Sequence, residues 1–355
     1  MISTIVWGSG GIARDAIRAV DADPALELTA VLASDPDQVG RDAGDFAGLD
    51  RPLGVTVTAD SGAVLACRPR AVVYAGSGTT RSVDARADVL AALHTGAVVV
   101  TPPIAPLYDH RGSRPEVGAP LRAAVAAGGG SLVVCDVDPD WADHVLPLVL
   151  GGLDAGATTI RCREIVDYSG YDLPGSVRYL MGMGEPLSYL PPMLAPCMPT
   201  MVWGDRVRLL ARALGVELDE IRETMERVPL EVTVETDLMG KFESGGQGAV
   251  RFEVQGVVDG SPRIVIEHVG RVHPDCAPDW PTAPAPEPGR PGGSAHWILV
   301  EGAARVEATV EPGTEDGASS AVTRLVGAIA WVAGQESGLY DALDLARRSR
   351  VGPND

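Results

Sequence analysis

Lysine is nearly absent from this sequence: of the 29 basic residues only Lys241 is a lysine, and it lies in the glycine-rich stretch MGKFESGGQG. The chain therefore offers a single, unpromising candidate for a catalytic lysine that forms a Schiff base. Cysteine is also sparse, since the five cysteines are widely scattered and form no C-x-x-C pair. This spacing predicts neither a zinc cage nor a disulfide framework.

Long apolar runs and an excess of positive charge are missing too. No hydrophobic segment approaches the eighteen residues of a membrane-spanning helix, and Met1 leads into a strand-like segment without the features of a signal peptide. With 48 acidic against 29 basic residues the net charge is -19, which opposes binding to nucleic-acid phosphates. We expect a cytoplasmic protein with no membrane or nucleic-acid partner. The 355 residues, 45% hydrophobic, predict a soluble globular chain of about two domains.

The first part of the chain alternates strand-like and helix-like segments. The expected strands are apolar throughout, and the segments between them have helical spacing. Such strands, separated by helices, predict an α/β fold with a doubly wound parallel sheet of the Rossmann type over residues 1–142. The expected strands are 3–8, 26–34, 54–60, 71–76, 97–103 and 131–137, and the expected helices start near Gly11 and span 61–67, 83–96 and 120–129.

The pattern changes after Trp141 and predicts a second, α+β domain over residues 143–316. A helix over 141–152 and a half-exposed strand over 157–172 are followed by two predicted helical pieces, the second carrying Ile221, Met225 and Val228 on one stripe. Residues 231–310 predict an antiparallel meander with a two-residue turn at Asp259-Gly260. Residues 277–295 are expected to form a loop, and 317–355 to carry a last, docked helix.

A glycine-rich loop lies between the first strand and the first helix. In the pattern Gly8-x-Gly10-x-x-Ala13, missing side chains allow a close approach, and a helix amino terminus attracts an anion. The alternative is a plain turn, but the strand and helix on either side favour a dinucleotide-binding loop. The backbone expected to hold the pyrophosphate comprises Gly8, Ser9, Gly10, Gly11, Ile12 and Ala13.

The second strand ends at residues that suit the adenosine ribose. Asp35 lies 22 positions beyond Ala13, about where the fingerprint places such a group. Asp35 or Asp37 would bind a ribose diol and favour NAD, whereas Ser34 and Arg41 could receive the 2′-phosphate of NADP. The cofactor is therefore expected to be NAD or NADP.

Several segments resemble a known family. The motifs WGSGGIAR, ASDPDQVGRDAG, DYSGYDLP, MGMGEP and VQGVVDGSPRIVIEHVGRV are similar to those of the dihydrodipicolinate-reductase-like proteins that include 2,4-diaminopentanoate dehydrogenase and the native amine dehydrogenases. The resemblance implies a homodimer whose second domain closes over the nicotinamide and builds much of the dimer contact, with the C-terminal helix returning to the Rossmann domain. It also implies hydride transfer between the nicotinamide and an imine carbon formed from a small ketone or aldehyde and ammonia. Ala75, Gly76, Ser77 and Thr101 are expected to line the nicotinamide half of the cofactor.

Two segments depart from the family pattern. Where amine dehydrogenases carry a glutamate that binds ammonia, this chain has Ile104 and Ala105. At the end of the sixth strand the chain instead has DVDPDW, which places Asp138 and Asp140 where strand ends face a ligand. We expect one of these aspartates, with Tyr171, to handle protons. The alternative is that both aspartates cap the helix that starts near Trp141.

Other side chains are candidates for contact with substrate. Tyr168 and Tyr171 lie in DYSGYDLP, where either hydroxyl could donate a hydrogen bond, or both could simply pack on the sheet. His268 shares a strand face with Ile264 and Ile266, which is typical of a buried, satisfied histidine. No metal site is expected, since the histidines and cysteines show no tetrahedral spacing. The residues expected around the substrate are Ile104, Trp141, Tyr168 and His268.

Three functions fit these observations. The first is an NAD(P)-dependent oxidoreductase that acts on a C=N or C=O bond, in the manner of an amine dehydrogenase or imine reductase. The second, favoured by the missing glutamate, is a ketone or aldehyde reductase, or a reductase of preformed cyclic imines, that uses no ammonia. The third is a catalytically degenerate homologue that only binds the cofactor.

Overall fold

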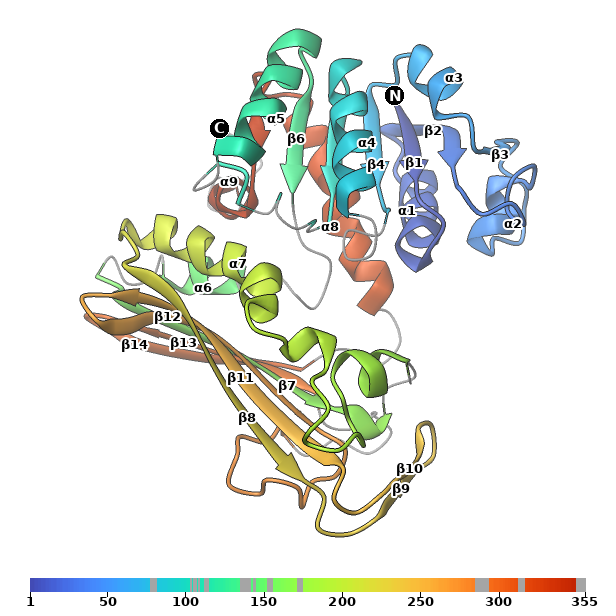
Figure 1. Cartoon of the computed structure of the whole chain (residues 1–355). Helices are drawn as coiled ribbons and strands as arrows, with labels where there is room; N and C mark the ends of the chain where they lie inside the picture. The colour runs from blue at the N-terminus through green and yellow to red at the C-terminus, as the bar shows by residue number, and fades with distance from the viewer. Residues whose placement is uncertain are drawn as a thin grey trace. The chain divides into compact units, whose positions relative to one another are not determined.

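The computed structural model divides the chain into two compact units. Unit 1 comprises residues 1–141 and 316–355, and unit 2 comprises residues 142–315 (Figure 1). The structure describes residues 1–76, 82–102, 104, 107, 109–111, 115–134, 142, 145–151, 156–170, 175–284, 294–311 and 317–348.

Unit 1 is built on a seven-stranded sheet in the order β15-β6-β5-β4-β1-β2-β3, in which every pair is parallel. The predicted Rossmann-type sheet is therefore confirmed, with the strand order reversing between β1 and β4. The three strands β4, β5 and β6 are buried along their whole length, as expected of a parallel sheet covered on both faces. The bounds are β1 Ile2–Trp7, β2 Leu26–Leu32, β3 Val57–Thr58, β4 Ala71–Tyr74, β5 Val98–Thr101, β6 Ser131–Val134 and β15 Leu339–Tyr340.

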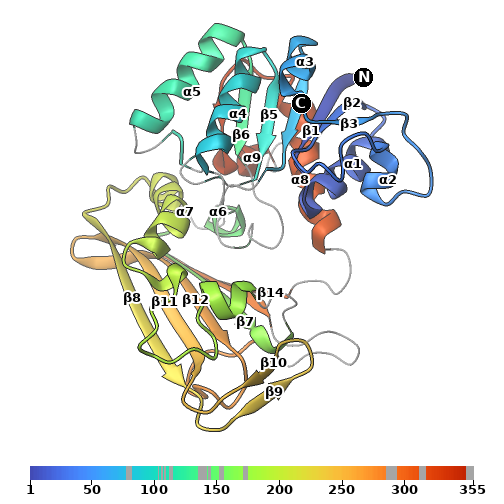
Figure 2. The ribbon, with the colours of Figure 1, turned by 45° about the vertical axis from the view of Figure 1, so that its right-hand side comes forward.

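Helices cover both faces of this sheet. Helices α4 (Ser82–His94) and α5 (Pro115–Gly128) lie side by side on one face, and α1 (Gly11–Ala22) and α8 (Gly317–Val332) pack together on the other (Figures 1 and 2). The shorter helices are α2 (Ala43–Ala47), α3 (Ser61–Ala66) and α9 (Ala342–Arg348). The C-terminal helix α8 belongs to the core of unit 1, because six of its described side chains are buried against α1, β4 and β5: Val322, Leu325, Val326, Ala328, Ile329 and Val332.

Unit 2 contains a six-stranded mixed sheet in the order β14-β13-β7-β12-β11-β8. The predicted turn at Asp259-Gly260 joins β11 to β12, and both residues have positive φ, +52° and +72°, as a type I′ hairpin requires. A separate two-stranded sheet comprises β9 (Val234–Thr236) and β10 (Gly240–Phe242). The strands of the large sheet are β7 Thr159–Asp167, β8 Glu220–Pro229, β11 Gln247–Val258, β12 Ser261–Arg271, β13 Ala295–Glu301 and β14 Arg305–Val310.

The structure corrects two expectations for unit 2. The strands of 231–310 do not form a simple antiparallel meander, because β7 inserts between β12 and β13 and runs parallel to β12. The helix predicted around Met225 is strand β8, which pairs antiparallel with β11. Ile221 and Glu223 are half-buried while Glu220 and Arg222 are exposed, so burial alternates at that end of β8 with the period of a strand. Backbone pairing with the edge of β11 therefore determines the structure of this segment, although its apolar residues have helical spacing.

Helices define two faces of the large sheet. Helix α7 (Met198–Leu214) packs on β8, β11 and β12, and α6 (Val145–Gly151) contacts β13. Val207 and Leu210 of α7 are buried against Val254, Ile264 and Ile266. We call this side the inner face and the opposite side the outer face. The remaining helical segments of unit 2 are short: Tyr168–Gly170, Gly175–Leu180 and Pro192–Leu194.

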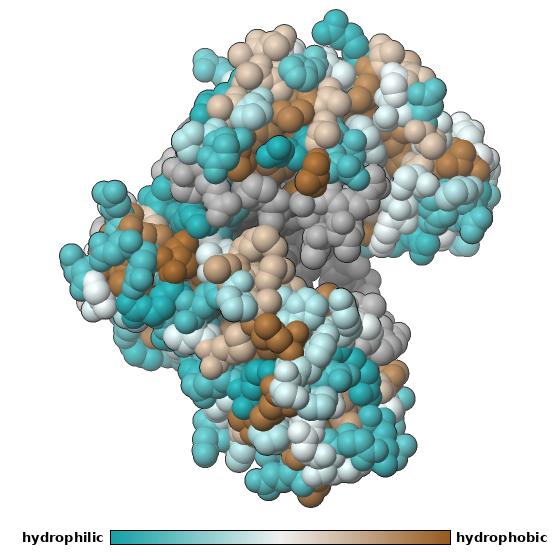
Figure 3. Space-filling view, in the orientation of Figure 1, coloured by the Kyte–Doolittle hydropathy of each residue, from teal (hydrophilic) through white to brown (hydrophobic). Residues whose placement is uncertain are grey.

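The surface is mixed in character. On the side seen in Figure 3, hydrophobic residues are scattered in small groups among hydrophilic ones over both units. None of the described helices is both long enough and apolar enough to cross a lipid bilayer.

Candidate functional site

The glycine loop occupies the turn between β1 and α1. The amide of Gly8 donates to the carbonyl of Leu32 (2.8 Å). A Cβ at Gly8 would lie 2.5 Å from the carbonyl oxygen of Ala75, so only glycine lets the end of β1 approach the end of β4 this closely. A Cβ at Gly10 or Gly11 would meet nothing within 4 Å. The loop is thus packed tightly on the sheet side and open where a ligand would approach.

The amino terminus of α1 faces this open side. Its N-cap residue, Gly10, makes no side-chain capping hydrogen bond, and the first amides of a helix have no acceptor within the helix. Ala13 is fully buried, so the helix lies close to the sheet. Free amides and the positive end of the helix dipole together suit a pyrophosphate. The residues present therefore fit a dinucleotide.

Residues after β2 lie next to the loop. The side-chain amide of Gln38 donates to the carbonyl of Ser9 (3.4 Å), while its Oε1 is buried without a partner among the described residues. Asp35 is half-buried, and its Oδ1 accepts from the amide of Asp37 (3.0 Å). A buried, unsatisfied oxygen beside the loop is consistent with a ligand that donates a hydrogen bond there. No pattern in the sequence marked Gln38.

The two candidates for the 2′-phosphate lie at the surface. Ser34 is exposed, and the guanidinium of exposed Arg41 donates to the carbonyl of Asp45 (3.4 Å). Arg41 is therefore directed to the backbone of α2. This geometry leaves Asp35 as the half-buried polar side chain at the end of β2.

The residues predicted to line the nicotinamide lie at or just after the ends of β4 and β5. The amide of Ala75 donates to the carbonyl of Trp7 (2.7 Å), and Thr101 is fully buried with its hydroxyl donating to the carbonyl of Pro102 (3.1 Å). Ile104 is also buried, at 1% exposure. Since parallel strands end at one edge, the sheet brings Gly8, Asp35, Ala75, Gly76 and Thr101 to a common edge. Five predicted residues lie outside the described residues: Ser77, Asp138, Asp140, Trp141 and Tyr171.

In unit 2, a chain of hydrogen bonds joins three side chains on the inner face of the sheet. His268 lies between Tyr168 and Glu164, with its Nε2 2.9 Å from the Tyr168 hydroxyl and its Nδ1 2.8 Å from Oε2 of Glu164. A carboxylate can only accept, so Nδ1 carries a hydrogen and donates to Glu164. In the neutral ring Nε2 then accepts the hydroxyl hydrogen of Tyr168. We call these residues the Glu164–His268–Tyr168 chain.

Neighbouring residues fix the chain in place. The His268 ring stacks on Phe252, with ring centroids 5.1 Å apart, and is only 5% exposed. The Tyr168 ring lies over Gly270, where a Cβ would be 2.3 Å from Cε2 of the tyrosine. Trp203 of α7 lies beside the histidine at 6.4 Å between centroids. The rings of His268 and Tyr168 are thus fixed by packing as well as by hydrogen bonds.

Glu164 lies in a row of polar residues across three strands. It is opposite His268 of β12 on one side and His296 of β13 on the other. Burial acts to raise the pKa of Glu164, but the hydrogen bond and charge of His268, with His296 and Arg206 of α7, outweigh it and hold the pKa well below its ordinary value. Glu164 is therefore a carboxylate at neutral pH.

The sequence singled out two of these three residues. His268 shares the inner face with Ile264 and Ile266, as its spacing indicated, and both ring nitrogens have partners. Glu164 was not a candidate. Apolar Ile160, Cys162 and Val166 alternate along β7 and lie on the inner face. Glu164 falls in the same alternation, so this pattern could have placed Glu164 on the inner face.

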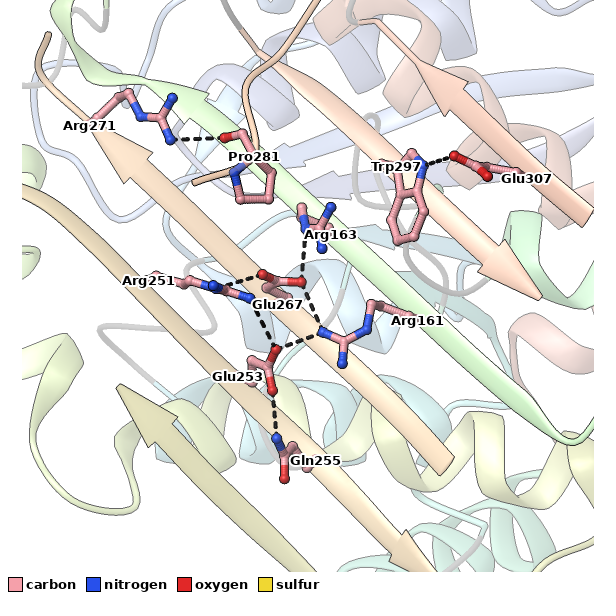
Figure 4. A network of polar contacts seen from close by, with 10 residues as sticks. All are labelled: Arg161, Arg163, Arg251, Glu253, Gln255, Glu267, Arg271, Pro281, Trp297 and Glu307. Atoms are coloured by element: carbon pink, nitrogen blue, oxygen red, sulfur yellow. Dashed lines mark hydrogen bonds and ion pairs between the residues drawn. The ribbon is translucent and has the colours of Figure 1, made fainter. Parts of the chain in front are cut away.

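The outer face of the same sheet carries a separate ionic network (Figure 4). Glu267 of β12, whose side chain is fully buried, accepts from Arg161 (3.0 Å), Arg163 (2.8 Å) and Arg251 (2.8 Å). Glu253 of β11 accepts from Arg161 as well (2.6 Å). These residues come from β7, β11 and β12 and lie on the face opposite to His268. The network is therefore distinct from the Glu164–His268–Tyr168 chain.

Known proteins resemble the chain over its whole length. A family model described as the 2,4-diaminopentanoate dehydrogenase C-terminal domain matches residues 201–351. An amine dehydrogenase of Streptomyces virginiae is 57% identical over 358 residues, which cover 99% of this chain and 98% of that protein. The structure of an amine dehydrogenase from Mycobacterium smegmatis aligns with a TM-score of 0.70 at 20% identity, covering 97% of this chain and 95% of that one. Biliverdin reductase from Synechocystis, in complex with biliverdin and NADP+, aligns with a TM-score of 0.54 at 12% identity, covering 97% and 94%.

The two solved structures support the fold, and the sequence relative identifies the family. The resemblance inferred from the motifs is confirmed by the Streptomyces relative and by the family model. Because the match to that relative runs through nearly the whole of both chains at 57% identity, the chain belongs to the amine dehydrogenase family of oxidoreductases.

Proposed function

We propose that the protein is a nicotinamide-nucleotide-dependent amine dehydrogenase that transfers a hydride to the carbon of a C=N bond, or of a C=O bond. The observation that carries the proposal is the Gly8–Ala13 loop, which is packed against β4, open toward solvent and followed by an uncapped helix terminus. The relative named amine dehydrogenase supports the choice of reaction. When bound, the nicotinamide supplies the hydride, and the protein supplies binding and orientation.

The residues that would bind the nucleotide follow from the edge of the unit 1 sheet. Amides of residues 9–13 would hold the pyrophosphate, Asp35 the adenosine ribose, and Ala75, Gly76, Ser77 and Thr101 the nicotinamide half. We propose a preference for NAD, since a carboxylate at Asp35 repels a 2′-phosphate and Arg41 is directed to the Asp45 carbonyl. Titration of the protein with each nucleotide tests this preference. Tighter binding of NADP than of NAD would contradict it.

The proposed substrate is a small carbonyl compound with ammonia, or the corresponding amine in the reverse direction. Ile104, Trp141, Tyr168 and His268 are proposed to surround it. Asp138 and Asp140, with Tyr171, are the groups that the residue pattern suggests for proton transfer. The proposed assembly is a homodimer, for which sedimentation should give twice the 36.9 kDa of one chain.

The reaction is tested by following nucleotide oxidation with a panel of ketones and aldehydes, with and without ammonium. Ammonium should raise the rate and give the amine as product. A rate that ammonium does not change would indicate the alternative that buried, apolar Ile104 favours, a carbonyl or cyclic-imine reductase that holds no ammonia. Nucleotide binding without turnover would indicate a degenerate homologue.

The proposed aspartates are tested by substitution. Asp138→Asn and Asp140→Asn are compared with Asp275→Asn, a matched control whose side chain is 92% exposed. One of the first two should lower turnover by about 100-fold or more, the size of a general acid–base contribution. If both stay within a few-fold of the parent while nucleotide still binds, these aspartates do not transfer protons.

A further inference from the structure

We propose that the Glu164–His268–Tyr168 chain is a proton relay of the amination reaction, in which Tyr168 is a further catalytic acid–base group besides the aspartates proposed above. His268 positions Tyr168 and takes up its proton, and Glu164 positions His268. This inference rests on the proposed function, since it assigns a step of that reaction to residues of unit 2. It starts from the hydrogen bonds of 2.9 and 2.8 Å that join the three side chains.

The direction of the hydrogen bonds allows His268 to accept a proton from the Tyr168 hydroxyl. Glu164 fixes the hydrogen of His268 on Nδ1, so Nε2 presents a lone pair to the Tyr168 hydroxyl. When the hydroxyl proton moves to Nε2, the resulting imidazolium lies against the ionised Glu164 carboxylate. The arrangement is that of a hydroxyl, an imidazole and a carboxylate in series, in which the carboxylate orients the ring and stabilises its charged form.

The surroundings hold this chain in one geometry. Among the residues that the structure describes, His296 of β13 and Arg206 of α7 are the further charged or titratable groups that act on Glu164, while β11 contributes the uncharged ring of Phe252. Stacking on Phe252 fixes the plane of the His268 ring, and the missing side chain at Gly270 lets the Tyr168 ring lie on the sheet. Such rigid placement is what proton transfer requires.

The chemical step balances with ammonium as the nitrogen source. Ammonium gives one proton to Tyr168, whose own proton passes to Nε2 of His268, and the freed lone pair of ammonia forms a bond to the carbonyl carbon. The adduct then shifts one proton from nitrogen to oxygen. The relay returns its proton to that hydroxyl, the C–O bond breaks, water leaves, and the nitrogen lone pair forms the C=N bond. The product is the iminium that accepts the hydride, and the relay ends as it began.

The relay would supply acid–base chemistry that the apolar side chain of Ile104 cannot supply. Ile104 cannot hold ammonia or move a proton, and it is buried in unit 1. Glu164 is an ionised carboxylate, but it acts through His268 and Tyr168 rather than by direct contact. The relay therefore places an acid–base group on the α+β unit.

The test compares Tyr168→Phe with Tyr189→Phe, a matched loss of one hydroxyl in the same unit. Tyr189 donates to the carbonyl of Tyr179 and lies outside the relay. We expect Tyr168→Phe to lower kcat for ketone plus ammonium by about 100-fold or more. Nucleotide affinity should change less than about twofold, and Tyr189→Phe should keep the parent activity. A Tyr168→Phe enzyme within about threefold of the parent would overturn the proposal.

Glu164→Gln separates a relay from a purely structural contact. The amide keeps an acceptor for Nδ1 but removes the charge that stabilises the imidazolium, so the acid limb of the rate against pH should move to lower pH. A pH profile identical to that of the parent would also overturn the relay. An unsubstituted protein that shows no ammonium-dependent turnover would instead refute the proposed function, and the relay with it.

Discussion

At the residue scale, Gly8 and Gly10 lack side chains for different physical reasons. The space beside Gly8 is filled by the backbone of Ala75, whereas the space beside Gly10 is empty. Gly10 has an ordinary backbone conformation, with φ −93°, so alanine fits there without strain. The first glycine thus serves the packing of unit 1, and the second lies beside open space.

This difference predicts that alanine at position 8 lowers stability, whereas alanine at position 10 weakens nucleotide binding. Gly8→Ala should lower the melting temperature of the free protein by several degrees, because its Cβ would lie 2.5 Å from a backbone oxygen. Gly10→Ala should leave that temperature nearly unchanged and weaken nucleotide binding by at least about tenfold. Thermal melting and nucleotide titration measure the two effects. A Gly10→Ala protein with full affinity would place the pyrophosphate elsewhere.

Residues of the candidate site were predictable where a backbone pattern marks them. The loop at Gly8–Ala13 follows from the spacing of small residues between a strand and a helix. The partners of Gln38 and Glu164 could not be found in this way, since each contact reaches across the fold, to Ser9 in one case and to His268 in the other. A polar residue gives no sign in the sequence of the partner it will meet.

At the scale of elements, a contact with a distant segment likewise explains why residues 220–229 form strand β8 and not the predicted helix. Its apolar residues follow a helical spacing, yet the strand forms because the backbone of β11 has an open edge to pair with. The fold class and the hairpin at Asp259-Gly260 were predictable, since alternation and turn residues are local signals. The parallel insertion of β7 was not, because it joins strands about a hundred residues apart.

Three strands of the large sheet are also joined by the outer-face network around Glu267 (Figure 4). Glu267→Ala should lower the free energy of unfolding of unit 2 by about 3–5 kcal/mol, because the three arginines would lose their buried counter-charge. Urea unfolding followed by circular dichroism measures this loss. Exposed Glu217→Gln is the control and should change the unfolding energy by less than about 0.5 kcal/mol. A similar small change for Glu267→Ala would show that the network contributes little to stability.

The same network predicts a loss of stability in acid. Burial acts to raise the pKa of Glu253, but hydrogen bonds from Arg161 and Gln255 and the charges of Arg161 and Arg251 lower it below its ordinary value of 4.5. A carboxyl with a lower pKa in the folded state stabilises the fold above the unfolded-state pKa, and the stabilisation is lost as pH falls below about 4.5. Urea unfolding at several pH values should therefore show a gap in the free energy of unfolding between the parent and Glu253→Gln, and this gap should narrow in acid. A constant gap would contradict the role of this ionised group.

At the scale of the whole molecule, unit 1 is formed from both ends of the sequence. Removal of residues 317–355 should abolish nucleotide binding and expose apolar surface, because α8 fills the core beside α1. Each of its buried aliphatic side chains contributes about 1.5–3 kcal/mol. Removal of residues 349–355 alone keeps α8 and α9 and should preserve binding. Dye binding and nucleotide titration distinguish the two truncations, and full binding by the shorter chain would show that α8 is dispensable.

The discontinuity of unit 1 sets an order for folding during synthesis. The ribosome releases strand β1 before unit 2 and helix α8 after it. Part of the core of unit 1 therefore stays uncovered until α8 is available, whereas unit 2 has its complete sequence earlier. Chaperone binding to nascent chains should consequently persist until residue 332, the last residue of α8, has emerged from the ribosome.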